Sequence, residues 1–383
     1  MSDHAALQID LWGDIIEQED KGFLSEQLIT YIGNKRSLLD FIGQGLNVVK
    51  KRIGKNRVKC LDLFSGSGVV SRYLKQHSSL LIANDIERYV EVINSCYLMN
   101  KTDVPFQKIK KAHGELTKIL SDDQNLKDGF IRNLYSPYDH DSIKHGERCF
   151  YTPRNAKYID TARQLINTLP EDLQKYFLAP LLSSASVHTN TSGVFKGFYK
   201  NTETGLGQFG GNNRNALTRI LGNIELKLPL FSNFECDFQV CRDDANKIIE
   251  WIDEVDVAYI DPPYNQHPYG SNYFMLNLIA DYVPPDEISG ISGIPKNWYR
   301  SHYNKTQKAH DAIKDLVEKI KAKYLLISFN SEGFITVEAM LNILNGVGKV
   351  DVIETKYNAF RGSRNLFGRD THVKEYLYLV EKR

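Results

Sequence analysis

The sequence predicts an α/β fold whose sheet is largely parallel. Apolar runs with the length of buried strands alternate with segments of helical periodicity over residues 58–84, and the alternation resumes from residue 238. Residues 101–235 break this rhythm with turn-rich pieces and isolated helical patterns. We therefore predict an acidic, irregular tail (1–25), one α/β domain in two segments (26–100 and 236–383), and a second domain (101–235) inserted between them.

The first block predicts a helix followed by a β-α-β unit. In chain order, the expected elements are a helix (37–49), a strand (58–64), a tight turn (65–68), a helix (69–76) and a strand (80–84). The turn has the sequence Ser-Gly-Ser-Gly, and Asp85 follows the second strand.

Gly66, Gly68 and Asp85 together indicate a nucleoside pocket. Glycine lets the backbone approach a ligand where a Cβ would collide, and an acid about twenty residues further on can accept hydrogen bonds from a ribose diol. A dinucleotide fingerprint would need glycine where Ser71 stands, so an NAD site fits less well. The alternative is a glycine turn without a ligand, but the preceding segment 62–64 and the following Asp85 favour a pocket.

The second block continues the alternation up to its last two strands. The expected strands are 238–241, 255–260, 324–329, 350–357 and 376–380, and the expected helices are 244–254, 306–319 and 335–344. Because no helix separates the last two strands, one of them is expected to run antiparallel.

Asp261-Pro262-Pro263-Tyr264 directly follows the expected strand 255–260, where a buried strand would end. Two prolines stiffen the backbone beside a carboxylate and an aromatic ring. These groups suit the grip of a planar amine such as the exocyclic amine of a nucleobase. The alternative is an ordinary turn at the end of a strand.

Composition narrows the setting without naming a function. The 383 residues carry a net charge of +1, with 42% apolar and 25% charged residues, which is typical of a globular protein. The five cysteines form an odd set without a CxxC pair, so neither a zinc site nor a disulfide framework is expected, and no metal is predicted. No run approaches the roughly 18 apolar residues of a spanning helix, and the N-terminus lacks a signal peptide. We expect a cytoplasmic protein without a membrane partner.

Four motifs carry a family resemblance. Residues 31–36 (YIGNKR), 62–68 (DLFSGSG), 84–85 (ND) and 261–264 (DPPY) resemble, in that order, the motifs of Dam-like N6-adenine-specific DNA methyltransferases. The resemblance covers residues 30–100 and 236–383. It implies a Rossmann-like S-adenosylmethionine-dependent methyltransferase fold, with a target-recognition domain inserted before the DPPY strand, where residues 101–235 lie.

The resemblance also implies residues that bind S-adenosylmethionine. Lys35 is expected at the carboxylate end of the cofactor, Asp85 at the ribose hydroxyls, and Asp244 or the adjacent Asp243 at the adenine amine. Asp244 aligns better, and its alternative role is that of a helix N-cap. The full expected cofactor set is Tyr31, Lys35, Asp62, Phe64, Gly66, Gly68, Asp85, Asp244 and Asp261.

The expected catalytic residues are Asp261, Pro262, Pro263 and Tyr264. Hydrogen bonds from the amine to the Asp261 carboxylate and the Pro262 carbonyl would free the nitrogen lone pair and stabilise the positive charge that develops on it. The base must leave the duplex at a cost of a few kcal/mol. Stacking on Tyr264 would return about 1–3 kcal/mol.

Residues that contact double-stranded DNA are expected in polar loops that combine cations with glycines or aromatic rings. The candidates are Lys196, Lys200, Arg214, Arg300, Arg361 and Arg364. The alternative for each is an ordinary surface loop.

The expected function is sequence-specific methylation of adenine N6 in double-stranded DNA, within a restriction-modification system whose endonuclease acts separately. Two alternatives remain. The first is methylation of cytosine N4 or of RNA on the same fold, and Asp261 rather than serine at the start of the motif favours adenine. The second is a DNA-binding module without activity. Neither the DNA recognition sequence nor the oligomeric state follows from the sequence.

Overall fold

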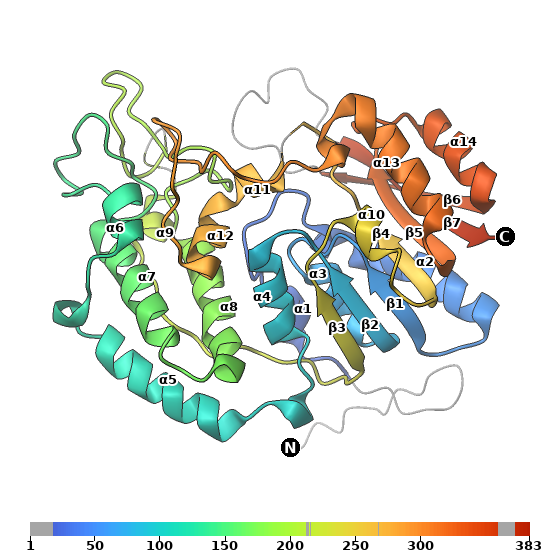
Figure 1. The fold of residues 1–383 in the computed structure, drawn as a ribbon, viewed down its shortest axis with the longest axis horizontal. Helices are drawn as coiled ribbons and strands as arrows, with labels where there is room; N and C mark the ends of the chain where they lie inside the picture. Colours follow the sequence, from blue (N-terminus) through green and yellow to red (C-terminus); the bar gives the residue numbers. More distant parts are fainter. Residues whose placement is uncertain (1–17, 212–213, 215, 267, 359–371) are drawn as a thin grey trace, which may run out of the picture.

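The fold was analysed in a computed structural model that describes residues 18–211, 214, 216–266, 268–358 and 372–383. Figure 1 shows two parts side by side: a twisted sheet with helices on its faces, and a group of helices next to it. The sheet is mostly parallel, which confirms the predicted α/β, Rossmann-like fold class.

A seven-stranded sheet with the order β3-β2-β1-β4-β5-β7-β6 organises the first part. Its strands are β1 (Val58–Asp62), β2 (Ser78–Asn84), β3 (Asp237–Cys241), β4 (Val255–Ile260), β5 (Ala322–Asn330), β6 (Gly348–Asn358) and β7 (His372–Lys382). Strands β1 to β5 pair in parallel. β7 lies antiparallel between β5 and β6, as the missing helix between the last two strands predicted.

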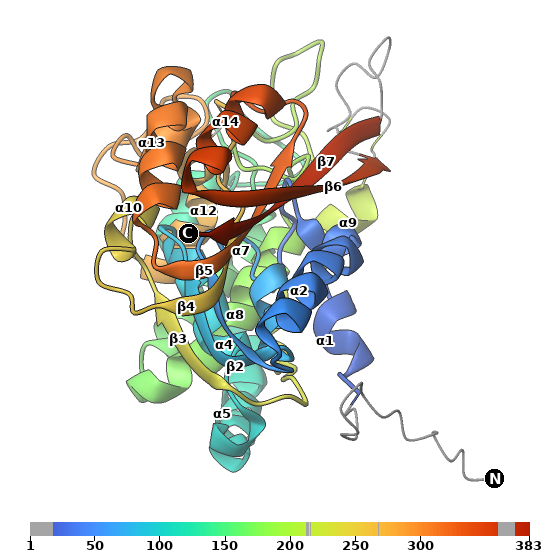
Figure 2. The same ribbon diagram turned by 90° about the vertical axis from the view of Figure 1, so that its right-hand side faces the viewer.

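Helices cover both faces of the sheet because its central strands are apolar on both sides. All residues of β4 are buried, and alternate side chains enter two different clusters. Figure 2 shows the two helical layers on opposite sides of the strands. One layer contains α10 (Ala245–Ile248), α13 (Thr306–Lys319) and α14 (Val337–Val347), and the other contains α2 (Leu39–Ile53) and α3 (Val69–Lys75).

The second part is a helical cluster that draws on distant segments. Its core unites α4 and α5 to α8 with α12, which comes from beyond the DPPY motif. The sequence boundary at residue 236 therefore separates α12 from the helices that it packs against. The helices are α4 (Arg88–Tyr97), α5 (Phe106–Leu120), α6 (Phe130–Tyr135), α7 (Pro153–Ile166), α8 (Glu171–Val187), α9 (Leu217–Leu221), α11 (Tyr269–Asn272) and α12 (Phe274–Asp281).

The predicted tail 1–25 is packed at its end. Helix α1 (Lys21–Ser25) is capped by Asp20, and Phe23 is 1% exposed. The Arg72 guanidinium donates to the Phe23 carbonyl and stacks over its ring, which joins α1 to α3. Short 3-10 turns complete the fold: η1 (Lys35–Leu38), η2 (Lys101–Asp103), η3 (Asp123–Asn125) and η5 (His302–Asn304).

Two elements differ from the prediction in ways that affect the site. The expected helix 244–254 is only α10, because the chain turns after Ile248 to enter β4 at Val255. The helices α11 and α12 were not expected. Among the described residues, no helix combines the length and apolar composition needed to cross a membrane.

The strand order places a crevice between β1 and β4. From β1 the chain passes through α3 to β2 on one side, whereas β4 lies on the other side. In open α/β sheets, ligands bind at the carboxyl ends of the strands where the order reverses in this way. The fold thus brings Asp62, Asn84 and Ile260, the last residues of β1, β2 and β4, to one edge.

Candidate active site

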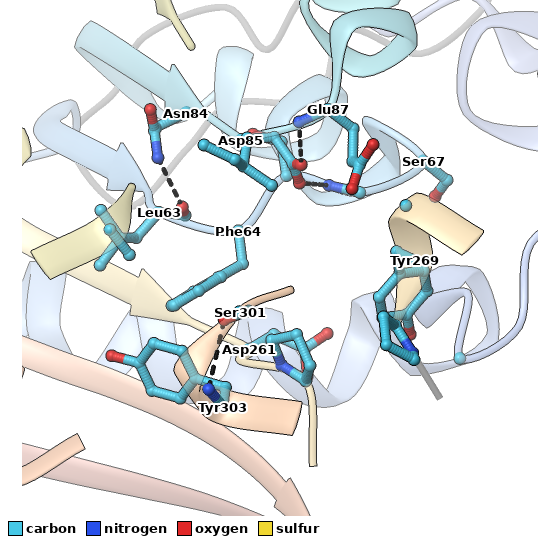
Figure 3. A pocket seen from close by; sticks show the side chains of 18 of the residues that line it. Leu63, Phe64, Ser67, Asn84, Asp85, Glu87, Asp261, Tyr269, Ser301 and Tyr303 are labelled. Carbon is cyan, nitrogen blue, oxygen red and sulfur yellow. Dashed lines mark hydrogen bonds between the residues drawn. The ribbon is translucent and has the colours of Figure 1, made fainter. Parts of the chain in front are cut away.

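A pocket opens at this edge of the sheet, and residues of all four sequence motifs line it. Figure 3 shows Phe64 and Ser67 of the glycine turn, Asp85 and Asp261 around it. The pocket holds about 880 Å³ of empty space, including space open to solvent. Its lining includes the predicted residues Tyr31, Lys35, Phe64, Gly66, Asp85, Asp244, Asp261 and Pro263. Four other predicted residues, Asp62, Gly68, Pro262 and Tyr264, lie outside this lining.

The glycine turn forms one wall of the pocket, and its backbone requires glycine. Gly66 has φ +52°, and an added Cβ would lie 3.0 Å from the Tyr31 ring. Gly68 has φ +73° and begins α3, where a Cβ would meet Asn94 Oδ1 at 2.7 Å. Both positions therefore disfavour any side chain. Only Gly66 lies against the pocket, while Gly68 packs behind it.

Asp85 braces this turn and faces the pocket. Its Oδ2 accepts from the Gly66 amide at 2.9 Å and its Oδ1 from the Glu87 amide at 3.0 Å. Burial raises the pKa of Asp85, and the backbone hydrogen bonds oppose that rise. Glu87, which the sequence analysis did not single out, also lines the pocket; burial raises its pKa to about 7, opposed by a hydrogen bond from Asn277.

Asp62 supports the turn from below and does not reach the pocket. It is fully buried, and its Oδ2 accepts from Ser71 Oγ at 2.5 Å. Its Oδ1 has no hydrogen-bond partner among the described residues. Burial raises the pKa of Asp62 to about 7, against the opposing Ser71 hydrogen bond. Asp62 is absent from the pocket lining, so its expected direct contact with the cofactor gains no support from this geometry and stays a prediction.

Two adjacent aspartates line the opposite wall. Asp244 caps α10 by accepting from the Asn246 amide, and its Oδ2 accepts from the Tyr299 hydroxyl at 2.5 Å. The helix-cap role is thus present together with a position on the pocket. Asp243 also lines the pocket, so the structure keeps both acids beside the expected nucleoside. Phe64 completes this wall, edge to face with Tyr303 at 5.2 Å.

A stack of tyrosines joins the first motif to the segment after DPPY. The Tyr31 ring is parallel to the rings of Tyr269 at 4.9 Å and Tyr273 at 4.8 Å. The hydroxyls of Tyr269 and Tyr273 bond to the Ile32 backbone. Tyr269 lines the pocket, and sequence reasoning missed it because no local motif marks α11.

Lys35 lies between two carboxylates. Its Nζ is 3.1 Å from Asp261 Oδ1 and 3.2 Å from Glu375 Oε1. Burial alone would lower the pKa of Lys35, but Asp261 and Glu375 outweigh it and hold the pKa well above its usual value. The expected contact of Lys35 with the cofactor's carboxylate gains no support from this arrangement, because the ammonium is already engaged. Glu375, on β7, was not predicted.

Lys35 and Asp261 both line the pocket, but Lys35 is only 4% exposed, whereas 18% of the Asp261 side chain is exposed. Burial raises its pKa to about 6; Lys35 opposes the rise and Glu375 adds to it. The carboxylate is therefore ionised at neutral pH. Tyr264 lies beside it, with its ring edge to face with Phe329 and 5.7 Å from the Lys35 ammonium.

A basic groove adjoins the pocket. Its lining contains Lys196, Lys296, Arg300, Lys305 and Trp298, and no acid of the described residues lines it. The Arg300 guanidinium stacks on Trp298 at 4.3 Å. The groove shares Pro268, Ser301 and Asn304 with the pocket.

The remaining predicted DNA residues lie elsewhere. Lys200 and Arg214 are exposed outside the groove lining, with Lys200 over the Phe198 ring. Arg361 and Arg364 lie outside the described residues.

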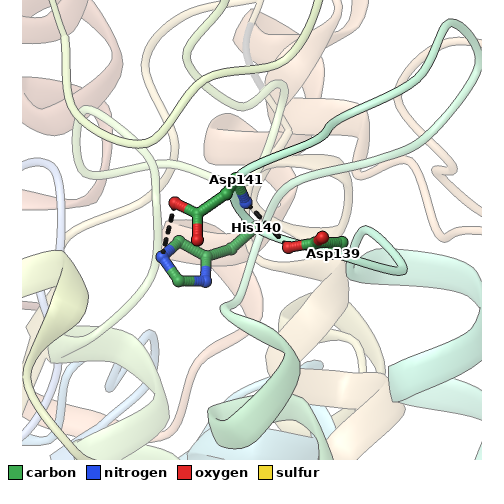
Figure 4. A group of neighbouring side chains, drawn as sticks. All are labelled: Asp139, His140 and Asp141. Atoms are coloured by element: carbon green, nitrogen blue, oxygen red, sulfur yellow. Dashed lines mark hydrogen bonds and ion pairs between the residues drawn. The ribbon is translucent and has the colours of Figure 1, made fainter.

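One exposed group among the described residues has the composition of a metal site: Asp139, His140 and Asp141 (Figure 4). The three residues are consecutive, and the Asp141 amide donates to Asp139 Oδ1. Their proximity therefore follows from a local turn. None of them lines the pocket or the groove.

Comparisons with known proteins agree with this geometry. A family model described as D12 class N6 adenine-specific DNA methyltransferase matches residues 31–343. The Type II methyltransferase M.NlaIII of Neisseria lactamica is 31% identical over 92% of this chain and 99% of its own length. The Type II methyltransferase M.CviAII of Paramecium bursaria Chlorella virus 1 is 30% identical over 92% and 98%. The Type II methyltransferase M.FokI of Planomicrobium okeanokoites is 27% identical over 92% of this chain but 52% of its own length.

The family match covers most of the chain and includes the glycine turn, Asp85 and the DPPY motif. The chain therefore belongs to the D12 class of N6 adenine-specific DNA methyltransferases.

Proposed function

We propose that the pocket binds S-adenosylmethionine and that Asp261 accepts the exocyclic amine of an adenine that has left the duplex. The observation that carries the proposal is the position of the Asp261 carboxylate. It is ionised at neutral pH, partly exposed, and lines the same pocket as the glycine turn and Asp85.

The residues present fit this cofactor. Gly66 lines the pocket beside Tyr31, whose ring occupies the space that a Cβ would need, so the turn backbone and the ring can both face the cofactor. Asp85 is placed to accept from ribose hydroxyls, and Asp243 or Asp244 to accept from an adenine amine. Bound there, S-adenosylmethionine supplies an electrophilic methyl group on its sulfonium.

Asp261 prepares the nucleophile. The amine of adenine is a poor nucleophile because its lone pair is delocalised into the ring. A carboxylate that accepts an N–H hydrogen bond localises the lone pair and stabilises the positive charge that develops on nitrogen. The Pro262 carbonyl would accept the second N–H. The prolines keep both acceptors in a fixed geometry, which lowers the entropic cost of alignment.

Tyr264 would stack on the extruded base, and the basic groove would bind the DNA backbone next to the pocket. Extrusion costs a few kcal/mol, and stacking on an aromatic ring returns about 1–3 kcal/mol. Lys196, Arg300 and Lys305 line the groove that meets the pocket, where they would neutralise backbone phosphates of double-stranded DNA. Sequence specificity would come from the helical part and the loops beside this groove.

The relatives named as Type II methyltransferases cover nearly the same length as this chain. We infer that the protein is the modification enzyme of a restriction-modification system and that the cognate endonuclease is a separate protein.

Transfer of a radiolabelled methyl group from S-adenosylmethionine to duplex DNA tests the proposal. The wild type should label DNA, whereas Asp261→Ala should lose labelling and keep its affinity for DNA. Undiminished labelling by Asp261→Ala would refute the assigned role. Matched duplex and RNA substrates in the same assay would show whether RNA is the substrate instead.

A further inference from the structure

Three charged side chains form a line that runs from the pocket into the protein. Asp261 has 18% of its side chain exposed, Lys35 has 4%, and Glu375 has none. Glu375 does not line the pocket, but its Oε1 is 3.2 Å from Lys35 Nζ and accepts from Ser328 Oγ at 2.5 Å. The pocket carboxylate is thus connected to a buried acid through one shared ammonium.

We propose that Glu375 is a positioning residue for methyl transfer: through Lys35, it fixes one oxygen of Asp261 and leaves the other oxygen for the target amine. This inference rests on the proposed function, because it assigns Glu375 a task only if Asp261 accepts that amine. Glu375 lines neither the pocket nor the groove. It acts through Lys35 alone.

The desolvation cost of burying Glu375 beside the Lys35–Asp261 ion pair argues against a purely structural role for this cluster. One lysine and one aspartate would neutralise each other, so a second buried carboxylate adds a desolvation cost that the pair does not need. Glu375 Oε2 also has no hydrogen-bond partner among the described residues. β5 and β7 hold the acid in place through Ser328 and the antiparallel ladder.

Sharing the ammonium keeps Asp261 a strong acceptor. Because Lys35 also faces Glu375, it cannot fully compensate the Asp261 carboxylate, which retains negative charge for the nitrogen that becomes positive during transfer. The groups that act on Asp261 from neighbouring elements are Lys35 on η1, Asp62 on β1, Tyr259 on β4, Tyr269 on α11 and Glu375 on β7. Glu375 raises the pKa of Asp261, and Lys35 lowers it.

The test compares Glu375→Gln with the wild type in single-turnover methyl transfer, with saturating S-adenosylmethionine and duplex DNA, as a function of pH. Glu375→Gln should slow transfer at neutral pH by roughly ten- to a hundredfold through lost alignment. Loss of the negative charge should also move the acidic limb of the profile to lower pH. Cofactor affinity, measured by calorimetry, should stay within about twofold, since Glu375 touches no ligand. Glu375→Asp, which keeps the charge, should slow transfer but leave the acidic limb near its wild-type position.

Asp256→Asn is the matched control. Asp256 is a buried aspartate of β4 with lysine partners, at the end of the strand opposite to Asp261. It should alter thermal stability without moving the acidic limb. A folded Glu375→Gln with the wild-type rate and limb would overturn the inference.

If Glu375→Gln does not fold, Ser328→Ala supplies the test, because it removes the hydroxyl that holds Glu375. Slower transfer with retained cofactor affinity would support the inference, and an unchanged rate would overturn it. A wild type without any transfer would instead overturn the proposed function, and the inference with it.

Discussion

An aspartate with lysine partners lies at each end of β4, but the pKa values of the two aspartates are shifted in opposite directions. At the amino end, Asp256 accepts from the Lys59 amide and pairs with Lys55 and Lys323, each at 3.0 Å. At the carboxyl end, Asp261 shares Lys35 with Glu375. Burial alone would raise the pKa of Asp256, but these donors outweigh it and lower the pKa, whereas the pKa of Asp261 rises to about 6.

The difference separates an acid that stabilises the fold from one that is poised for chemistry. Two lysines pair with the single charge of Asp256, so that charge is fully compensated within the protein. Asp261 shares its one ammonium partner, Lys35, with Glu375, and its side chain is partly exposed to the pocket. The Asp261 carboxylate can therefore still accept hydrogen bonds from a ligand. Perturbed carboxylates of the second kind are typical of functional sites.

The largest effect is expected from removing the ammonium at the carboxyl end. Lys35→Met leaves Asp261 and Glu375 buried without a counter-ion, and breaking such a pair costs about 3–5 kcal/mol of folding free energy. The pKa of Asp261 should rise, so the acidic limb of methyl transfer should move to higher pH. Chemical denaturation and a pH profile measure the two effects.

The same change at the amino end is the control. Lys323→Met should cost far less because Lys55 and the Lys59 amide remain with Asp256. Equal losses at the two ends would contradict the contrast between them.

Replacing the amino-end acid should separate stability from activity. Asp256→Asn removes a charge that two lysines face, and a lost buried charge-assisted interaction is worth about 1.5–3 kcal/mol. Methyl transfer per folded molecule should match the wild type. Thermal denaturation combined with a single-turnover assay checks both statements, and a defect in transfer with normal stability would show that the two ends are coupled.

The contributions of Asp261 and Asp256 to folding stability should depend on pH with opposite signs. The rate should fall about tenfold per unit as pH drops below about 6, because Asp261 must be ionised to accept the amine. Because its pKa is raised on folding, ionised Asp261 destabilises the folded state at neutral pH, and this cost is relieved as pH falls through about 6 towards its unfolded pKa of about 3.9. Asp256, with a lowered pKa, contributes stability above its unfolded pKa of about 3.9, which is lost as pH falls further through its folded pKa. A rate profile from pH 8 down to pH 5 and a stability profile from pH 8 down to about pH 2, on the same preparation, should show the separation.

The smallest effect is expected in the groove, which lies outside both ends of β4. Arg300→Ala should raise the KM for DNA a few-fold and reduce the slope of log affinity against log salt by about 1. The single-turnover rate at saturating DNA should not change. Lys200→Ala is the comparison, since Lys200 lies outside the groove lining. An equal effect of the two substitutions would contradict the proposal that the groove binds DNA.

Local patterns predicted the sheet well. The expected strand 255–260 and helix 306–319 coincide with β4 and α13, because one is buried on both faces and the other has a regular apolar stripe. Helix α12 escaped prediction since it is apolar on most sides, packed between α4 and α8, and so shows no amphipathic period. The sequence predicted the last two strands and that one of them runs antiparallel. The pairing with β5 shows that this strand is β7.

The site was predictable where a motif is contiguous. The glycine turn, Asp85 and Asp261 follow from local residue patterns at strand ends. Glu375 and Tyr299 do not, because their partners Lys35 and Asp244 are distant in the chain and only the fold brings them together. Glu375 shares its strand face with Leu377 and Leu379 and is fully buried, although a glutamate is usually exposed.

Analysis of methylated nucleosides by mass spectrometry tests the central claim most directly. Duplex DNA treated with S-adenosylmethionine and wild-type enzyme, Asp256→Asn or Asp261→Asn would be digested and compared. We expect N6-methyladenine from the wild type and from Asp256→Asn, and none from a folded Asp261→Asn. Formation of N4-methylcytosine, or N6-methyladenine at the wild-type level from Asp261→Asn, would contradict that claim.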